Sequence, residues 1–167
     1  MGSTIVIRAA VVDDAETLHA ALVGIEAATE DGLSVTSTVN DLRRYGFGDK
    51  PAFAALIAEA DGQTAGVCIY FPSFSTFRGK PGVYVQDLYV DPRWRGAGIG
   101  AKLLQRLAAQ TRATGGAYIR LSVEADNVAA QGFYDRVGLT HSASERIHAA
   151  YGEAFQALAD AADETEQ

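Results

Sequence analysis

The sequence contains very little cysteine. Cys68 is the only cysteine among 167 residues, so an intramolecular disulfide is impossible. Because Cys68 lies in a run typical of a strand, we expect it to be a core residue and not a nucleophile. His19, His141 and His148 show no metal-ligand spacing with cysteine or with acids, and we therefore predict no bound metal.

The chain also lacks a long apolar run and an excess of positive charge. No segment resembles a membrane span, and the N-terminus lacks the basic and apolar pattern of a signal peptide, so we expect a cytoplasmic protein with no membrane partner. The net charge of −7 disfavours nucleic acid and anionic membranes, since both need a basic face. It is compatible with a cationic substrate, although many soluble proteins are acidic without having one.

Apolar residues, by contrast, are abundant enough for a substantial core. Hydrophobic residues make up 48% of the chain and charged residues 21%, a composition that excludes a disordered protein. The length predicts a single domain over residues 1–167 with no internal repeat or linker. We expect its acidic tail, residues 160–167, to be frayed.

The order of apolar patterns and turn residues predicts an α/β (α+β) protein with a mixed sheet and helices on both faces. Asp61-Gly62 is a strong signal for a two-residue hairpin. The expected strands cover 5–8, 52–60, 63–71, 83–90, 117–123 and, as a possible last strand, 146–151. The expected helices cover 13–28, 37–45, 101–114, 127–137 and 153–161, with a loop at 72–81.

The stretch from Val83 to Leu104 carries the strongest functional signal. Its apolar strand is stopped by Asp91-Pro92, and the glycine-rich turn from Arg95 to Gly100 then opens into a helix. Glycines let the backbone approach a ligand closely, and the first N–H groups of a helix have no internal partners. Arg95 adds a charge that can pair with phosphate oxygens, so this stretch predicts a phosphate-binding site.

Several interpretations of this turn compete. A Walker loop is excluded, because Gly-Lys followed by Ser or Thr is absent. A dinucleotide fingerprint fits Gly96, Gly98 and Ala101, with Glu124 at the distance of a ribose contact. That motif, however, begins only after an insertion that follows the strand. The remaining interpretations are a purely structural turn and the R-x-x-G-x-G pyrophosphate loop of the GCN5-related N-acetyltransferases, which Arg95, Gly98 and Gly100 match.

The chain resembles the GCN5-related N-acetyltransferase (GNAT) family over nearly its whole length, and most closely its spermidine/spermine, diamine and thialysine branch. The stretches that carry the resemblance are Ile7-Arg8, Asp41-Leu42, Tyr45-Gly46-Phe47-Gly48, Gln86-Asp87-Leu88-Tyr89-Val90, RGAGIG from Arg95, and Asn127 with Tyr134 seven residues later. The resemblance implies a mostly antiparallel sheet of six to seven strands with splayed central strands. It also implies acetyl-CoA as the donor, an amine as the acceptor and a homodimer.

The resemblance further implies roles for individual residues. The backbone around Tyr89, at Leu88 and Val90, would bond the acetyl and pantetheine groups, and Asn127 would meet the pantetheine arm. Tyr134 would be the general acid and a further donor contact. The implied pyrophosphate loop consists of Arg95, Gly96, Ala97, Gly98, Ile99, Gly100 and Ala101.

The chemistry of amine acetylation asks for the same roles. A free alkyl amine has a pKa of about 10 and must lose a proton before it attacks a thioester. A strand N–H can stabilise the oxyanion of the tetrahedral intermediate, and a phenol can protonate the leaving thiolate. Tyr134 fits the phenol role, while the alternative is an aromatic core residue beside Phe133.

One residue departs from the polyamine branch. That branch has Glu-Asp where this chain has Gln86-Asp87, and an amide cannot take a proton, although it can orient a water. Adjacent strand residues face opposite ways, so we do not expect Asp87 simply to replace the glutamate. Asp87 would instead hold a cationic acceptor, with Glu26 or Glu30 as a possible base through water. Asp31 and these two glutamates could line a cationic site or be solvated, and we favour solvated side chains.

The main hypothesis is therefore an acetyl-CoA-dependent N-acetyltransferase that acts on a small primary amine, such as a diamine, a polyamine or a thialysine-like amino acid. An alternative in the same class is an enzyme that acetylates a peptide, a protein or an aminoglycoside. A non-catalytic acyl-CoA-binding module is a third possibility, because the position of the base is altered while the loop is intact.

Overall fold

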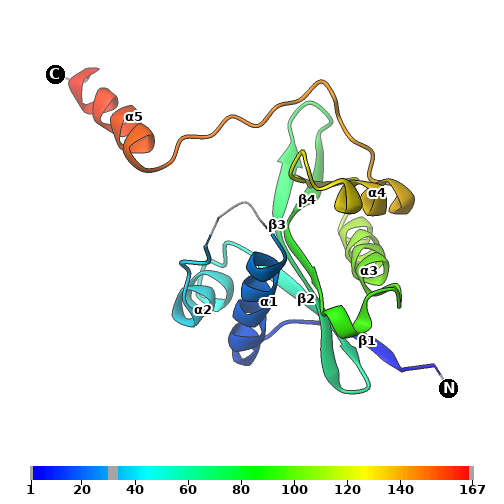
Figure 1. Cartoon of the computed structure of the whole chain (residues 1–167). Coiled ribbons are helices and arrows are strands. Elements are labelled where there is room, and N and C mark those ends of the chain that lie inside the picture. Colours follow the sequence, from blue (N-terminus) through cyan, green and yellow to red (C-terminus); the bar gives the residue numbers. More distant parts are fainter. Residues whose placement is uncertain (1, 30–33, 166–167) are drawn as a thin grey trace.

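The computed structural model describes residues 2–29 and 34–165, in which helices and strands alternate around one sheet (Figure 1). Glu30 and Asp31 lie outside the described residues. The strands are β1 (Ile5–Ala9), β2 (Ala54–Ala60), β3 (Gln63–Ser75), β4 (Lys80–Val90) and β5 (Ile119–Leu121). The helices are η1 (Val12–Asp14), α1 (Ala15–Ala28), α2 (Val39–Phe47), η2 (Pro92–Trp94), α3 (Ile99–Ala113), α4 (Val128–Val137) and α5 (Gly152–Thr165).

The sheet has the strand order β1-β2-β3-β4-β5 and is mixed, as predicted. The first four strands pair antiparallel, and β5 pairs parallel to β4. The hairpin between β2 and β3 turns at Asp61 and Gly62, with φ angles of 51° and 79°. Positive φ at both central residues is what a type I′ hairpin requires, so the dipeptide signal is confirmed.

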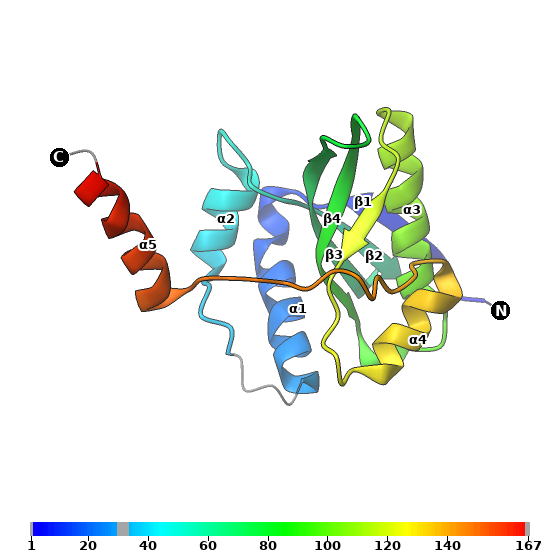
Figure 2. The ribbon, with the colours of Figure 1, turned by 90° about the horizontal axis from the view of Figure 1, so that it is seen from above.

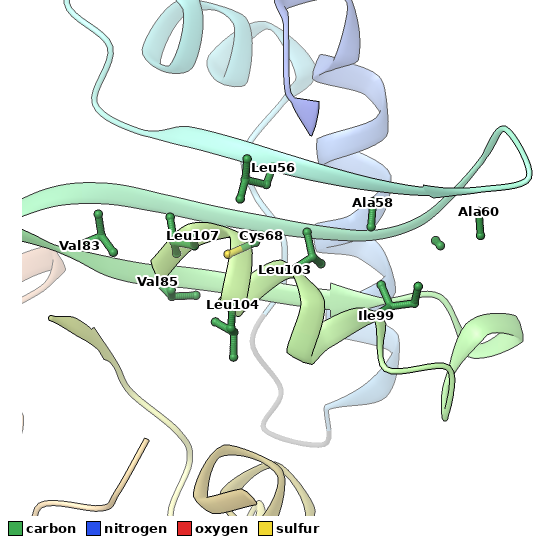
Figure 3. Packing of buried hydrophobic residues seen from close by; sticks show 11 residues of the cluster. Leu56, Ala58, Ala60, Cys68, Val83, Val85, Ile99, Leu103, Leu104 and Leu107 are labelled. Carbon is green, nitrogen blue, oxygen red and sulfur yellow. The ribbon is translucent and has the colours of Figure 1, made fainter. Parts of the chain in front are cut away.

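Helices cover both faces of the sheet and build a separate core on each side (Figure 2). On one face, α1 and α2 bury Leu18 and Leu42 against Ile57 and Val67. On the other face, α3 turns its apolar stripe to the sheet, because leucines spaced three and four apart share one side of a helix. Figure 3 shows these α3 side chains, Ile99, Leu103, Leu104 and Leu107, over residues of β2, β3 and β4.

A β-bulge interrupts β4 at Gln86. In the pairing with β3, Ile69 lies opposite Asp87, while the next residue, Tyr70, lies opposite Val85, so Gln86 is the extra residue. Val85 and Leu88 consequently pack on the same α3 face although they are three positions apart. Asp87 therefore lies on the α1 face, where strict alternation from Val85 would have placed Gln86. The regular alternation assumed from the sequence is therefore interrupted between Val85 and Asp87.

The expected loop at 72–81 is mostly strand. β3 continues to Ser75 and β4 begins at Lys80, so only residues 76–79 connect them. Pro72 suggested a loop because proline cannot donate to a sheet ladder. It is tolerated because the pairing of β2 with β3 starts at Ala54 and Tyr70, so β3 has only one neighbour at Pro72.

The sheet has five strands in the described part of the chain, and not six to seven. β5 is shorter than the expected 117–123, and residues 146–151 form no strand. A strand needs a partner, but this segment runs away from the sheet towards α5, as Figure 1 shows. The fold class itself is confirmed, since the mixed sheet between two helical layers is the predicted arrangement.

Candidate functional site

The centre of the candidate site is an open edge in the middle of the sheet. β4 and β5 pair only from Val83–Ile119 to Val85–Leu121, whereas β4 continues alone to Val90. The N–H of Asp91 donates to the Ala65 carbonyl in β3 at 2.9 Å. Because successive peptide groups of a strand face opposite edges, those of Leu88 and Val90 point to the side that β5 has left. The predicted splay of the central strands is therefore present.

The glycine-rich loop lies directly beyond this open edge. Gly96 and Gly98 have φ angles of 82° and 77°, which other residues rarely adopt, and Gly98 is the N-cap of α3. The first amide of α3 that bonds back to the loop is that of Lys102, which donates to the Gly98 carbonyl at 3.0 Å. The N–H groups of Ile99, Gly100 and Ala101 precede it, so they have no helical acceptor and form an anion-binding helix end.

Two arginines flank this loop in different ways. The guanidinium of Arg93 pairs with the Asp91 carboxylate at 2.9 Å, and this contact holds the pKa of Asp91 down at about 2. Arg95 is exposed, and within the described residues its one hydrogen bond runs from Nε to the Val90 carbonyl at 3.4 Å. Arg95 is thus the cation with donors to offer a phosphate beside the free amides.

Two of the predicted loop residues also have packing roles. Ile99 is 1% exposed and belongs to the core on the α3 face. A Cβ on Gly100 would lie 3.0 Å from Cζ of Phe133 in α4 and 3.6 Å from Cγ2 of Val90. Glycine at this position lets α3 and α4 approach each other beside the open edge, which is a reason for the motif apart from ligand binding.

Helix α4 carries the remaining residues predicted for the donor side. Asn127 is its N-cap, with Oδ1 accepting the N–H of Ala130 at 3.1 Å. Tyr134 is half-buried on the α3 face, where its ring centroid lies 5.2 Å from that of Phe133. Burial raises the pKa of Tyr134 to about 12, with a smaller contribution from Cys68. The phenol therefore keeps its proton at neutral pH, as a general acid must.

Cys68 is a core residue, as predicted. Its side chain is fully buried in the cluster on the α3 face. Burial, together with the nearby Asp87 carboxylate, raises the pKa of its thiol to about 12. A thiol with such a pKa stays protonated and is a poor nucleophile.

A cavity of about 320 Å³ lies on the opposite face of the sheet, between the C-terminal half of α1, the segment that leads into α2, and β4. Asp87 and Glu26 contribute two carboxylates to its wall, and none of the described residues that line it is a lysine or an arginine. The other lining residues are Leu22, Ile25, Ser34, Val35, Thr36 and Ser37. The structure thus brings into one wall two acids that the sequence analysis assigned to the same cationic acceptor, Asp87 to hold it and Glu26 as a candidate base.

The two carboxylates of the cavity differ in their surroundings. Oε2 of Glu26 accepts the N–H of Val35 at 2.9 Å, which ties the end of α1 to the segment before α2. Asp87 is half-buried, and burial raises its pKa above the ordinary value. Glu26 is therefore anchored to a peptide group, whereas the proton affinity of Asp87 is increased.

The two other β4 residues of the predicted site lie apart from both positions. Gln86 is exposed at the bulge. The ring of Tyr89 faces α1, because a Cβ on Gly24 would lie 2.5 Å from it. Peptide groups along a strand face opposite edges in alternation. The peptide groups of Leu88 and Val90 face the open edge, and those of Tyr89 therefore face β3. The structure thus brings Leu88, Val90, the loop and α4 together, without Tyr89.

Two kinds of site are not seen in the described part of the chain. Residues 2–29 and 34–165 contain no group of three or more His, Cys, Asp and Glu side chains arranged to hold a metal ion. None of their helices has the length and hydrophobicity to cross a membrane.

Comparisons with known proteins agree with this geometry. The profile of the Acetyltransferase (GNAT) family matches residues 23–139. Thialysine N-epsilon-acetyltransferase of Bos taurus is 35% identical over 129 residues, which cover 71% of this chain and 75% of that protein. L-ornithine N5-acetyltransferase of Arabidopsis thaliana is 31% identical over 94 residues, or 56% of this chain and 41% of that protein.

Solved structures show the same fold at lower identity. An integron cassette protein of V. cholerae superposes with a TM-score of 0.78 at 20% identity, over 95% of this chain and 99% of the other. An aminoglycoside acetyltransferase from a soil metagenome, solved with sisomicin, gives a TM-score of 0.72 at 19% identity, over 89% of this chain and 95% of the other.

The arginine pair provides a test of the phosphate-binding loop. Replacing Arg95 by alanine removes its charge-assisted bonds, so we expect the affinity for acetyl-CoA, measured by calorimetry, to fall about tenfold or more. Arg93→Ala is the matched control, since Arg93 carries the same charge two residues away but is paired with Asp91. Equal affinities in the Arg95→Ala variant and the native protein would contradict the assignment.

Proposed function

Because the chain belongs to the Acetyltransferase (GNAT) family and is an N-acetyltransferase, we propose that it moves an acetyl group from acetyl-CoA to the primary amine of a small cationic acceptor. The acceptor class comprises diamines, polyamines and thialysine-like amino acids. The observation that carries the proposal is the open edge of β4, with an anion-binding loop and the α4 phenol on one face of the sheet and an acidic cavity on the other.

The residues on the α3 face fit the donor. The free amides at the start of α3 and the guanidinium of Arg95 suit a pyrophosphate. The peptide groups of Leu88 and Val90 that β5 leaves without a strand partner suit a chain of amides such as pantetheine, because buried backbone groups need hydrogen-bond partners. Asn127 lies at the start of α4, where its cap also fixes the helix that carries Tyr134.

The cavity on the α1 face fits the acceptor. A volume of about 320 Å³ is at the lower end of small-molecule sites, and it suits a short aliphatic chain better than a peptide or an aminoglycoside. Two carboxylates without a neighbouring cation favour a ligand with positive charge. The names of the relatives, which acetylate thialysine and ornithine, agree with a small amine as the acceptor.

The proposed reaction uses groups from both faces. Acetyl-CoA supplies an acetyl thioester, and the neutral amine attacks its carbonyl directly. In this proposal a strand N–H of Leu88 or Val90 donates to the oxygen that becomes negative in the tetrahedral intermediate, which the end of the β4–β5 pairing supports. Tyr134, whose phenol is protonated at neutral pH, gives a proton to the departing thiolate.

A panel of acceptors tests the proposed function. We expect thiol release from acetyl-CoA with one of putrescine, spermidine, thialysine, ornithine or lysine, because each carries a primary ammonium on a short aliphatic chain. An aminoglycoside and a short peptide complete the panel. Faster turnover with either of these would contradict a small amine as the acceptor. No thiol release with any acceptor, while acetyl-CoA still binds, would contradict the proposed function.

The role of Tyr134 has its own test. Tyr134→Phe removes the phenolic proton and keeps the ring that packs beside Phe133, so we expect kcat to fall about 100-fold or more. The dissociation constant for acetyl-CoA should change little. Phe133→Leu, which alters the adjacent ring, is the control for packing, and unchanged turnover in Tyr134→Phe would rule out the acid role.

We further propose that the protein is a homodimer formed through its C-terminal arm (residues 140–165). The arm carries large apolar side chains that its own sheet does not cover, namely Ile147, Tyr151, Phe155 and Leu158, which are 75%, 83%, 54% and 67% exposed. β5 has only β4 as a neighbour, so its outer edge is open. Between this edge and α3 lies a groove of about 510 Å³, walled by Ala108, Tyr118 and Ile119 among others. The exposed apolar side chains of a second copy's arm would fill this largely apolar groove.

The oligomeric state can be tested with single substitutions in α5. Leu158→Glu places a charge on the apolar side of the arm, so we expect the molecular mass measured by light scattering to fall to that of a monomer. Gln156→Glu adds the same charge at a polar position of the same helix and should leave the dimer intact. A monomeric native protein would contradict the proposal outright.

A further inference from the structure

Amine acetylation needs a general base, and this chain has no acid at position 86, where the base was expected. An acceptor that binds as an ammonium ion must lose a proton before its nitrogen can attack. Gln86 holds the position at which the polyamine branch has a glutamate, and an amide cannot accept that proton. The group that does so must lie on the acceptor side of the open edge, which is the α1 face.

The β-bulge brings Asp87 to this face. If β4 continued from Val83 and Val85 in regular alternation, with Gln86 paired as an ordinary strand residue, Asp87 would turn into the core on the α3 face. Its carboxyl group instead lines the acidic cavity, one residue before Leu88, whose peptide group faces the open edge. Asp87 is thus the acid of β4 that stands between the acceptor cavity and the proposed oxyanion donors.

The carboxyl group of Asp87 is not committed to another partner. Within the described residues it accepts no hydrogen bond and forms no ion pair, whereas Glu26 in the same cavity accepts the N–H of Val35. Besides Glu26, the titratable groups beside it are Cys68 on β3 and Tyr89 on the same face of β4, while Nε2 of His19 in α1 contacts the carbonyl of Ser37, another residue of the cavity wall, at 2.8 Å. None of these groups neutralises Asp87 with a permanent positive charge.

We propose that Asp87 is the general base of the reaction, taking the ammonium proton of the acceptor directly or through one water. The proposal rests on the proposed function and deepens it. The raised pKa of Asp87, caused by burial, agrees with this role, because a base works best when its pKa approaches the working pH. Glu26, fixed by the peptide of Val35, remains available as the anion that attracts the acceptor.

The step balances without any further reactant. A proton leaves the ammonium nitrogen for the Asp87 carboxylate, and the freed electron pair forms the new N–C bond. As the C–S bond breaks, the thiolate takes the proton of Tyr134. The attacking nitrogen still carries two hydrogens, and it releases one of them to solvent as the intermediate collapses, which balances the proton that Tyr134 regains from solvent. The net products are the N-acetyl amine, CoA thiol and one proton, which leaves Asp87 for solvent as the carboxylate is restored.

Asp87→Asn tests the assignment with the full chain and the best acceptor of the panel. At pH 7 we expect kcat/KM to fall at least about 100-fold, with an unchanged dissociation constant for acetyl-CoA. In the native enzyme, kcat/KM should level off above the pKa of Asp87. In the variant it should rise about tenfold per pH unit, because only amine already neutral in solution can react. Asp49→Asn makes the same change at an exposed carboxylate and should leave kcat/KM and its pH profile unchanged.

An acceptor that is neutral at pH 7 separates a base from a mere binding group. With a short alkoxyamine, the loss caused by Asp87→Asn should largely vanish, because no proton has to be removed before attack. Should Asp87 only hold the ammonium ion, the variant would raise KM, keep kcat and keep the native pH profile. That result would overturn the assignment. Absence of turnover by the native enzyme would overturn the proposed function and the assignment together.

Two further measurements guard against a variant that merely misfolds. Burial raises the pKa of Asp87 in the folded state, so its ionised form lowers the stability at pH 7, and this loss is regained as the pH falls through the folded pKa towards the unfolded one. Asp87→Asn should therefore unfold at a higher temperature than the native protein at pH 7, with the difference lost in acid. In Asp87→Ala, added formate should restore part of the turnover, and failure of both measurements would refute the role.

Discussion

The constraint on which the site depends is that β4 extends beyond the end of its pairing with β5. The parallel ladder ends at Val85 and Leu121, yet β4 runs on to Val90 with β3 as its one neighbour. An unpaired row of peptide groups inside a protein is costly unless a ligand or water satisfies it. The open edge is therefore a gap in the sheet. Within the described residues, it is where groups on the α1 face and groups on the α3 face can approach the same ligand.

The elements around the slot keep it open. Gly100 lets α3 approach the Phe133 ring, which sets α4 beside the end of β4 and not across it. On the other face, Gly24 lets α1 pack closely against the ring of Tyr89. The hydrogen bond from the Val35 N–H to the Glu26 carboxylate connects α1 to the segment that forms the other wall of the cavity. A glycine thus brings a helix close on each face, so the close packing and the functional geometry are parts of one arrangement.

Local signals in the sequence were sufficient for much of this structure. The hairpin at Asp61-Gly62 and the strand, loop and helix from residue 83 onward follow from turn chemistry and apolar patterning. The bulge at Gln86 leaves no local signal, because it is a property of the pairing with β3. The extended β3 and the absent strand at 146–151 likewise depend on neighbours that a single strand pattern does not specify.

The bulge also explains how the altered position 86 is compatible with an acetyltransferase. Strict alternation lets one residue in two reach the acceptor side, whereas the extra residue moves Asp87 to the side where Gln86 was expected. A half-buried carboxylate without a partner is unfavourable for stability, as the raised pKa of Asp87 shows. Such a residue is commonly tolerated where function requires it. The proposed base at Asp87 would thus keep the proton-accepting role on β4, one residue along from Gln86.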